Sequence, residues 1–193
     1  MSEVSIELIN ENHLARLVEL ANNPNISSTS GVPVNCQLDD AKAWLASSTE
    51  HKIGVPSTPE LHFTIFQKDI IVGCCILKKI NYGNQTAELS YWVGEPFWGQ
   101  GIATHSARCL LNTAFEILKL VRIDAHYLKL NNVASGSILK KLEFAADTNR
   151  TDLPVDGRFS CFYGDAWTFM SITKEVFIEP KLNSASASNL ETK

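Results

Sequence analysis

The part of the chain that most constrains its fold joins a predicted strand to a predicted helix through a loop with two glycines. The strand covers residues 86–93, and apolar side chains recur at helical spacing over 104–118. Gly99 and Gly101 lie in the loop between them. N–H groups at the start of such a helix have no partner inside it, and the helix dipole favours anions there. The segment therefore predicts a binding site for a phosphate or pyrophosphate group.

The remaining elements predict a mixed α+β fold. Residues 25–37 are rich in Ser, Thr, Asn, Gly and Pro and predict a loop. Hairpins come first and a β-α-β unit follows in the middle, which indicates a mixed, mostly antiparallel sheet and not a doubly wound parallel one. Strands are expected at 5–9, 61–67, 70–80, 121–128, 143–148 and 166–174, and helices from Asn10 or Asn12 to Asn23-Pro24, at 38–49 and at 133–142.

Length and composition predict one globular domain. The chain has 193 residues, of which 45% are apolar. We expect a single domain over residues 1–179 and a disordered tail over 180–193, where Ser, Ala and Asn dominate. With 17 basic against 21 acidic side chains, the net charge of −4 argues against a direct nucleic-acid partner. A basic partner or a small molecule suits the chain better.

The sequence shows no feature of a membrane, secreted or metal-binding protein. The longest apolar stretch, residues 70–77, falls short of the roughly 20 residues that span a bilayer. The opening Met-Ser-Glu-Val lacks the basic segment and apolar core of a secretory signal, so we expect a cytoplasmic protein with no membrane partner. Cys74 and Cys75 are expected on opposite faces of one strand, and the histidines lack metal-ligand spacing. No metal is expected.

Two other phosphate-binding loops fit the sequence less well. Gly-x-Gly before a helix also occurs in Rossmann dinucleotide sites, and Asp124 lies about where their ribose-binding acid would. The third glycine position holds Thr104, however, and the strand contains Glu88 and Ser90 where a Rossmann strand is continuously apolar. No Lys-Ser/Thr follows the second glycine, which excludes a P-loop.

Two consecutive segments around the glycines carry a family resemblance. They read Ala87-Glu88-Leu89-Ser90-Tyr91-Trp92-Val93 and Trp98-Gly99-Gln100-Gly101-Ile102-Ala103-Thr104. Together they resemble the acetyl-CoA-binding core of the GNAT superfamily of N-acetyltransferases, whose pattern is Gln/Arg-x-x-Gly-x-Gly/Ala; only the first position, Trp98, departs. Within this superfamily, the chain is similar to the branch of ribosomal-protein alanine and serine N-acetyltransferases. The similar positions are Trp98, Asn132-Val-Ala-Ser135 and Lys141-Leu142-Glu143-Phe144. The resemblance covers about residues 5–175, and implies helices on both faces of the sheet and a central β-α-β cofactor unit.

The resemblance implies a role for individual residues. The main chain of Val93 would pair with the pantetheine arm of acetyl-CoA where two strands splay apart. Asn132 would hydrogen-bond the pantetheine or acetyl end of the cofactor, and Ser135 would lie near the sulfur. Many relatives carry a tyrosine acid where this chain has Leu139, so Ser135, or a water it holds, is expected to protonate the departing thiolate. The pyrophosphate would be held by the N–H groups of Gly99, Gln100, Gly101, Ile102, Ala103 and Thr104.

Acetyl transfer also needs a neutral amine nitrogen as nucleophile. Glu88 is the expected general base, directly or through a water, because strand alternation puts it on the face of Ser90 and Trp92 near the splay. Asp165 is a weaker candidate. An α-amino group, with a pKa of about 7.7–8.0, needs little help at pH 7, whereas a lysine at about 10.4 needs strong deprotonation.

The acceptor and the oligomeric state remain open at this point. The branch resemblance and the acidic charge favour a protein N-terminal α-amino group of the ribosomal-protein type, attacking directly in a ternary complex. The alternatives are a small amine, such as an amino acid, polyamine or aminoglycoside, and a CoA-binding module without turnover, for which the missing tyrosine at Leu139 argues. Either a monomer or a homodimer is compatible with the sequence.

One further departure from the family concerns the end of the short helix at 133–142. Most relatives have glycine where this chain has Glu143. A residue just past a helix usually needs left-handed backbone, which is unfavourable for a residue other than glycine. We therefore expect this helix to end in a different shape.

Overall fold

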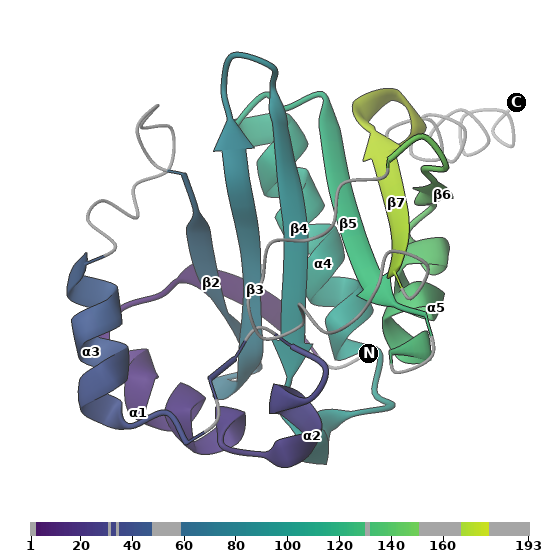
Figure 1. Cartoon of the computed structure of the whole chain (residues 1–193). Helices are drawn as coiled ribbons and strands as arrows, with labels where there is room; N and C mark the ends of the chain where they lie inside the picture. The colour runs from purple at the N-terminus through teal and green to yellow at the C-terminus, as the bar shows by residue number, and fades with distance from the viewer. Residues whose placement is uncertain are drawn as a thin grey trace, which may run out of the picture.

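The computed structural model describes residues 3–30, 32–33, 35–47, 59–129, 132–150 and 167–177, and the fold is built on one seven-stranded sheet (Figure 1). The strand order is β1-β2-β3-β4-β5-β7-β6. Only β4 and β5 run parallel, and every other neighbouring pair is antiparallel. The predicted mixed, mostly antiparallel sheet is confirmed. The strands are β1 (Val4–Leu8), β2 (Leu61–Gln67), β3 (Ile70–Asn81), β4 (Thr86–Val93), β5 (Arg122–Leu128), β6 (Ala145–Ala146) and β7 (Trp167–Thr173).

Helices cover both faces of the sheet, as expected. In Figure 1, α4 (Ile102–Asn112) lies behind the central strands, while α1 (Glu11–Ala21) and α3 (Leu38–Ser47) lie at the lower left of the view; α1 packs against β3 and α3. α5 (Val133–Lys141) packs beside β5 and α4. The two adjacent cysteines of β3 separate the layers, because Cys75 belongs to the larger buried cluster, with α4, and Cys74 to the smaller one, with α1. Their predicted opposite orientation is confirmed.

The parallel pair β4 and β5 separates halfway along β4. The register between these strands covers only Thr86–Glu88 against Arg122–Asp124 and ends at the pair Glu88 and Asp124. Beyond it, β5 continues its pairing with β7 on the other side. The backbone of β4 from Ser90 to Val93 therefore has a free edge toward β5, which is the splay that the family resemblance implies.

Some element boundaries differ from the sequence-based predictions. A short helix, α2 (Pro24–Ser27), lies at the start of the predicted loop at 25–37. Asn23 explains it, since its side chain accepts a hydrogen bond from the Asn25 N–H and Pro24 fits the first helical position. Asn23-Pro24 thus ends one helix and starts another. The strand predicted at 143–148 is reduced to Ala145–Ala146.

The helix after the glycine loop also differs from its prediction. It starts at Ile102 instead of residue 104, because Gly101 adopts a left-handed conformation, φ 77°, and forms the N-cap. The last turns, over Thr113–Ile117, form a π-helix. The additional two residues at the start bring the N–H groups of the helix end closer to Gly99.

The predicted change at the end of α5 is wrong. Glu143 adopts φ 68°, the left-handed conformation that glycine would provide, and the Phe144 N–H donates to the Leu139 carbonyl at 3.0 Å. Phe144 is buried, and its packing in the core compensates for the unfavourable backbone. Tertiary packing therefore preserves the usual helix end with an unusual residue.

Two sequence-based expectations lie outside the described residues. The proposed disordered tail over 180–193 is one, and Asp165 is the other. Among the helices of the described ranges, none is long and apolar enough to cross a membrane. The same ranges contain no group of three His, Cys, Asp or Glu side chains placed to hold a metal ion.

Candidate active site

A groove of about 500 Å³ runs from the free edge of β4 to the start of α4 and along α5. We call it the glycine-loop groove. The residues predicted to bind the cofactor line it, with one exception: Val93, Gly99, Gly101, Ile102, Ala103, Thr104 and Asn132. Ser135, predicted as the proton donor, lines it as well. The exception is Gln100, whose side chain contacts Gln67 and the Pro96 carbonyl instead. The prediction for Gln100 concerns its main chain, which the side-chain position does not affect.

The glycines keep the backbone of this loop open. Gly99 and Gly101 have φ of 75° and 77°, a conformation that side chains disfavour. A Cβ on Gly99 would have nothing within 4 Å, so the space beside this backbone is empty. The His105 ring covers one side of Gly101, where Nδ1 donates to the Gly101 carbonyl at 2.9 Å. The start of α4 thus borders the groove beside glycine backbone that carries no side chain, as the predicted anion site requires.

Trp98 explains how this chain tolerates its departure from the family pattern. The indole Nε1–H donates to the Val93 carbonyl at 2.6 Å and so connects the loop to the end of β4. The main chain of Val93 is predicted to pair with the pantetheine arm, and its carbonyl already accepts one hydrogen bond. A carbonyl oxygen has two lone pairs, and one remains for a ligand in the groove.

Asn132 and Ser135 shape the opposite wall of the groove at the start of α5. Asn132 is the N-cap, with its Oδ1 accepting from the Ser135 N–H at 3.2 Å, and its Nδ2 donates to the Thr29 carbonyl at 3.4 Å. These contacts hold α5 against the segment after α2. The Ser135 hydroxyl lies 3.0 Å from the Tyr91 hydroxyl. A serine predicted from the family motif thus has a phenol as its partner.

Tyr91 is a site residue that sequence reasoning missed. Burial raises its pKa to about 12, and the hydrogen bond with Ser135 opposes this shift only in part, so the phenol keeps its proton at physiological pH. Alternation along β4 was the sequence signal that could have found Tyr91. It directs the Tyr91 side chain away from Ser90 and Trp92, toward helix α5, which follows the parallel strand β5. The pairing with Ser135 joins residues 44 positions apart and needs the tertiary structure.

A small central cavity of about 80 Å³ adjoins the groove at the splay. It shares Tyr91, Asn132 and Ser135 with the glycine-loop groove. On its other side lie Glu88 and His126. The predicted base Glu88 and the predicted acid Ser135, from strand β4 and helix α5, therefore border the same cavity.

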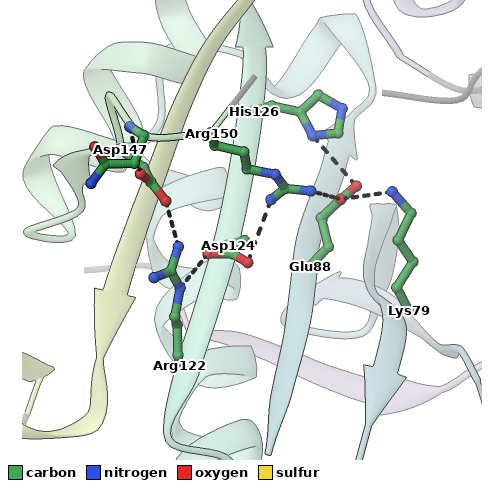
Figure 2. A network of polar contacts seen from close by, with 8 residues as sticks. Lys79, Glu88, Arg122, Asp124, His126, Asp147 and Arg150 are labelled. Carbon is green, nitrogen blue, oxygen red and sulfur yellow. Dashed lines mark hydrogen bonds and ion pairs between the residues drawn. The ribbon is translucent and has the colours of Figure 1, made fainter. Parts of the chain in front are cut away.

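Glu88 is the centre of a network of charged side chains (Figure 2). Its carboxylate is almost fully buried and lies 3.1 Å from Lys79 Nζ, 3.4 Å from His126 Nδ1 and 3.8 Å from Arg150 Nη2. Arg150 also contacts Asp124 Oδ2 at 3.4 Å. Because burial of an unpaired carboxylate is unfavourable, these partners stabilise Glu88 in its position. A structural role and a catalytic role are both compatible with this arrangement.

The position of Lys79 in this network depends on a bulge in β3. The register between β3 and β4 shifts between Lys78 and Asn81, and Lys79 has φ 50°. Regular alternation would send Lys78 and Lys79 to opposite faces, but here Lys78 borders the central cavity and Lys79 bonds Glu88. This contact could not be predicted from strand alternation.

His126 is the second site residue that sequence reasoning missed. Burial lowers the pKa of its imidazole below 6.5, although the charge of Glu88 acts in the opposite direction, so the ring is neutral at pH 7. Within the described residues, its buried Nδ1 has no partner in hydrogen-bonding geometry. Alternation along β5, which places His126 on the face of Asp124, was the signal that could have found it. A neutral imidazole beside the central cavity can accept a proton.

Comparisons with known proteins agree with this geometry. A family model described as "Acetyltransferase (GNAT) domain" matches residues 4–145. The probable N-acetyltransferase YjcK of Bacillus subtilis is 34% identical over 50% of this chain and 54% of its own length, and the ribosomal-protein-serine acetyltransferase of Escherichia coli is 36% identical over 26% and 28%. The chain thus matches about half or less of the length of these curated relatives.

A solved structure supports the fold. The spermidine N-acetyltransferase of Vibrio cholerae, solved in complex with CoA and spermine, superposes with a TM-score of 0.74 over 91% of this chain and 98% of that chain, at 19% identity. At this identity the likeness concerns the fold alone. Because the family model covers most of the sequence, and the sheet and its splay agree with it, the chain belongs to the GNAT acetyltransferase family.

Proposed function

We propose that this protein is an acetyl-CoA-dependent N-acetyltransferase that transfers acetyl to a primary amine by direct attack in a ternary complex. The observation that carries the proposal is the meeting of the glycine-loop groove and the central cavity at the splay. A donor in the groove and an amine in the cavity would meet between Ser135 on one side and Glu88 with His126 on the other.

The groove fits acetyl-CoA by the chemistry of its donors. The pyrophosphate would be held by main-chain N–H groups from Gly99 to Thr104, where glycine backbone and the helix dipole both suit an anion. The pantetheine arm would follow the free edge of β4 at Val93, and its amide groups would find hydrogen-bonding partners there and at Asn132. When bound, acetyl-CoA supplies the thioester that is the acetyl donor.

The side chains of the central cavity can handle the two protons of the reaction. The amine nitrogen forms a bond to the acetyl carbon as the carbon–sulfur bond breaks; one proton leaves the nitrogen and one reaches the sulfur. His126, or Glu88 acting directly or through a water, takes the proton from the nitrogen. The Ser135 hydroxyl, oriented by the hydrogen bond to Tyr91, or a water that Ser135 holds, provides a proton to the sulfur and regains one from solvent as the base releases the proton of the amine. This scheme therefore does not need the tyrosine acid that many relatives carry at the position of Leu139.

We propose a protein N-terminal α-amino group as the acceptor. One relative is a ribosomal-protein-serine acetyltransferase and another a putative ribosomal N-acetyltransferase from Bacillus subtilis, 30% identical over 42% of this chain and 44% of its own length. The net charge of −4 favours basic partners of that kind. An α-amine is also neutral often enough near pH 7 to react without a strong base.

A small-molecule amine is the second candidate acceptor. It has support from the fold neighbour, which acts on spermidine according to its name. The two candidates differ in the charge that the acceptor side must bind, since a polyamine carries several positive charges. A CoA-binding module without turnover is the alternative outside enzymes.

Calorimetric titration with acetyl-CoA, with NADH as the control ligand, tests the cofactor. We expect binding of acetyl-CoA alone, whereas binding of NADH alone would overturn the proposal. Thiol release and mass spectrometry with peptide amines and with spermidine then test turnover. Binding of acetyl-CoA without acetylation of any amine would identify a non-catalytic module, and acetylation of spermidine in preference to peptides would move the acceptor to the second candidate.

A further inference from the structure

A third cavity, of about 400 Å³, lies between the sheet and the helices α1 and α3, and we call it the apolar pocket. It falls within the size range of ligand pockets, roughly 300–1,000 Å³. Its walls come from α1, α3, β3 and β4. The main wall residues are Leu14, Leu17, Val18, Ala41, Ile76 and Trp92.

The apolar pocket adjoins the central cavity. Both cavities are bordered by Ser30, Lys78 and Ser90. Ser90 and Trp92 share one face of β4 with Glu88, so this face leads from the charged network into the apolar pocket. A group attached to an amine in the central cavity would therefore enter the apolar pocket.

Among the described residues, three charged side chains border this pocket: Asp40, Glu60 and Lys78. Glu60 is paired with His62 at 3.0 Å, and the Asp40 carboxylate accepts from the Gln37 N–H at 3.0 Å. Lys78, at the boundary with the central cavity, contributes a positive charge that repels a second ammonium group. Most of the other described residues that line the pocket are apolar, so its walls offer contact area mainly for carbon.

We propose that the apolar pocket binds the apolar group of the acceptor, so that the preferred substrate is a primary amine with a bulky aliphatic or aromatic group close to its nitrogen. This inference rests on the proposed function and narrows its acceptor. Such a group occurs in a peptide whose first residue is Leu or Phe, and in a free arylalkylamine. Both sources share the chemistry that the pocket recognises, an apolar substituent next to an amine.

The first experiment compares acceptors with the unchanged protein. Peptides that differ only in their first residue, Phe, Leu, Ala, Ser or Asp, are assayed for kcat/KM beside 2-phenylethylamine and spermidine. We expect the Phe and Leu peptides to exceed the Ser and Asp peptides by about ten- to a hundredfold, which is the discrimination that a hydrophobic pocket provides. A similar kcat/KM across all peptides, or a preference for spermidine, overturns the inference. High activity on 2-phenylethylamine compared with the peptides identifies a free amine as the source.

The second experiment fills the pocket. Ala41 is buried on the inner side of α3 and borders the pocket, whereas Ala46 of the same helix is exposed. Ala41→Leu is expected to remove the preference for Phe over Ser and to leave the affinity for acetyl-CoA unchanged. Ala46→Leu is the matched control, for which neither quantity should change. An unchanged preference in a folded Ala41→Leu variant overturns the inference.

A binding measurement separates this inference from the proposed function. The affinity for 2-phenylethylamine is measured by calorimetry with desulfo-CoA present, so that no turnover is needed. If no amine is acetylated, the proposed function fails, while binding that Ala41→Leu abolishes still supports the pocket assignment. If amines are acetylated but 2-phenylethylamine binds equally to the Ala41→Leu and Ala46→Leu variants, the pocket assignment fails and the proposed function stands.

Discussion

The glycine-loop groove and the acceptor side of the central cavity are built in different ways. The anion site predicted for the groove comes from the main chain of one continuous segment, residues 99–104, with glycines that keep the backbone accessible. The acceptor side takes its chemistry from side chains of separate elements, with Lys79 on β3, Glu88 on β4 and His126 on β5. Its apolar pocket adds walls from α1 and α3.

This difference explains which half of the site can be recognised in a sequence. A main-chain site requires a particular local conformation, and glycine spacing encodes that conformation directly. A side-chain site requires that distant strands align in register, and one bulge changes which residues meet. Local motifs are therefore expected to report the donor that the family shares, and tertiary contacts the acceptor of this individual protein.

The largest expected effect lies in the main-chain site. Gly101→Glu adds a side chain at φ 77° and places a negative charge beside the N–H groups that begin α4. We expect acetyl-CoA binding to fall by at least about a hundredfold, as both the strain and the repulsion act on the pyrophosphate position. Calorimetry measures the loss. Gly83→Glu, in the turn after β3, is the control, and equal affinity in both variants would contradict the assignment of the loop.

Ser135 tests the connection between the two halves. Ser135→Ala is expected to lower kcat by about a hundredfold, in the range of general acid catalysis, with little change in acetyl-CoA affinity. Tyr91→Phe should lower kcat by a smaller factor, because it removes only the partner of the Ser135 hydroxyl. In the Ser135→Ala background, Tyr91→Phe should have no further effect. Additive losses would show that Tyr91 does not act through Ser135.

The pH dependence of kcat/KM tests the side-chain half. In the proposed mechanism the neutral form of His126 accepts the proton, and burial lowers its pKa, so kcat/KM expressed per neutral amine should fall only as the pH drops below 6.5. Glu88→Gln removes a negative charge that raises this pKa, and the acid limb should shift to still lower pH. His126→Gln should lower kcat/KM about tenfold at pH 7 and abolish the limb. An unchanged acid limb in His126→Gln would assign the base to another group.

A smaller effect is expected where α5 packs on β5. A Cβ on Gly136 would lie 2.5 Å from Cζ of Tyr127, so Gly136→Ala requires the ring or the helix to move. We expect a loss of about 1–3 kcal/mol of stability, as for other overpacked sites, together with a lower kcat because Ser135 moves with the helix. Thermal unfolding measures the first and steady-state kinetics the second. Gly83→Ala should change neither.

The smallest effect is expected at the end of α5, outside both halves of the site. Residue 143 has left-handed backbone, φ 68°, which is unfavourable for Glu143. Glu143→Gly places there the residue that adopts this conformation most easily. The gain in stability should be about 1 kcal/mol or less, because glycine also loses more conformational entropy on folding. Lys140→Gly, inside the same helix, should instead destabilise the protein by about 1 kcal/mol. A destabilised Glu143→Gly variant would show that the Glu143 side chain makes a contact that matters.

Much of the fold was predictable because the elements have strong local signals. The alternation that separates Cys74 from Cys75, and the glycine loop before α4, are both short-range patterns. The helix α2 was not predicted, because Asn23-Pro24 can both end and start a helix. The shape of the end of α5 was predicted incorrectly, because the packing of Phe144 compensates for the backbone strain at Glu143.

The sequence by itself determined the family, the order of the strands and of the helices other than α2, and the segment that carries the predicted main-chain anion site. Each depends on residues a few positions apart, whose conformations follow from glycine spacing and from apolar periodicity. The tertiary structure alone decided that Tyr91 contacts Ser135, that Lys79 and His126 lie beside Glu88, and that an apolar pocket opens next to them. These contacts join elements far apart in the chain, and they depend on strand register, a bulge and burial, which no local pattern specifies.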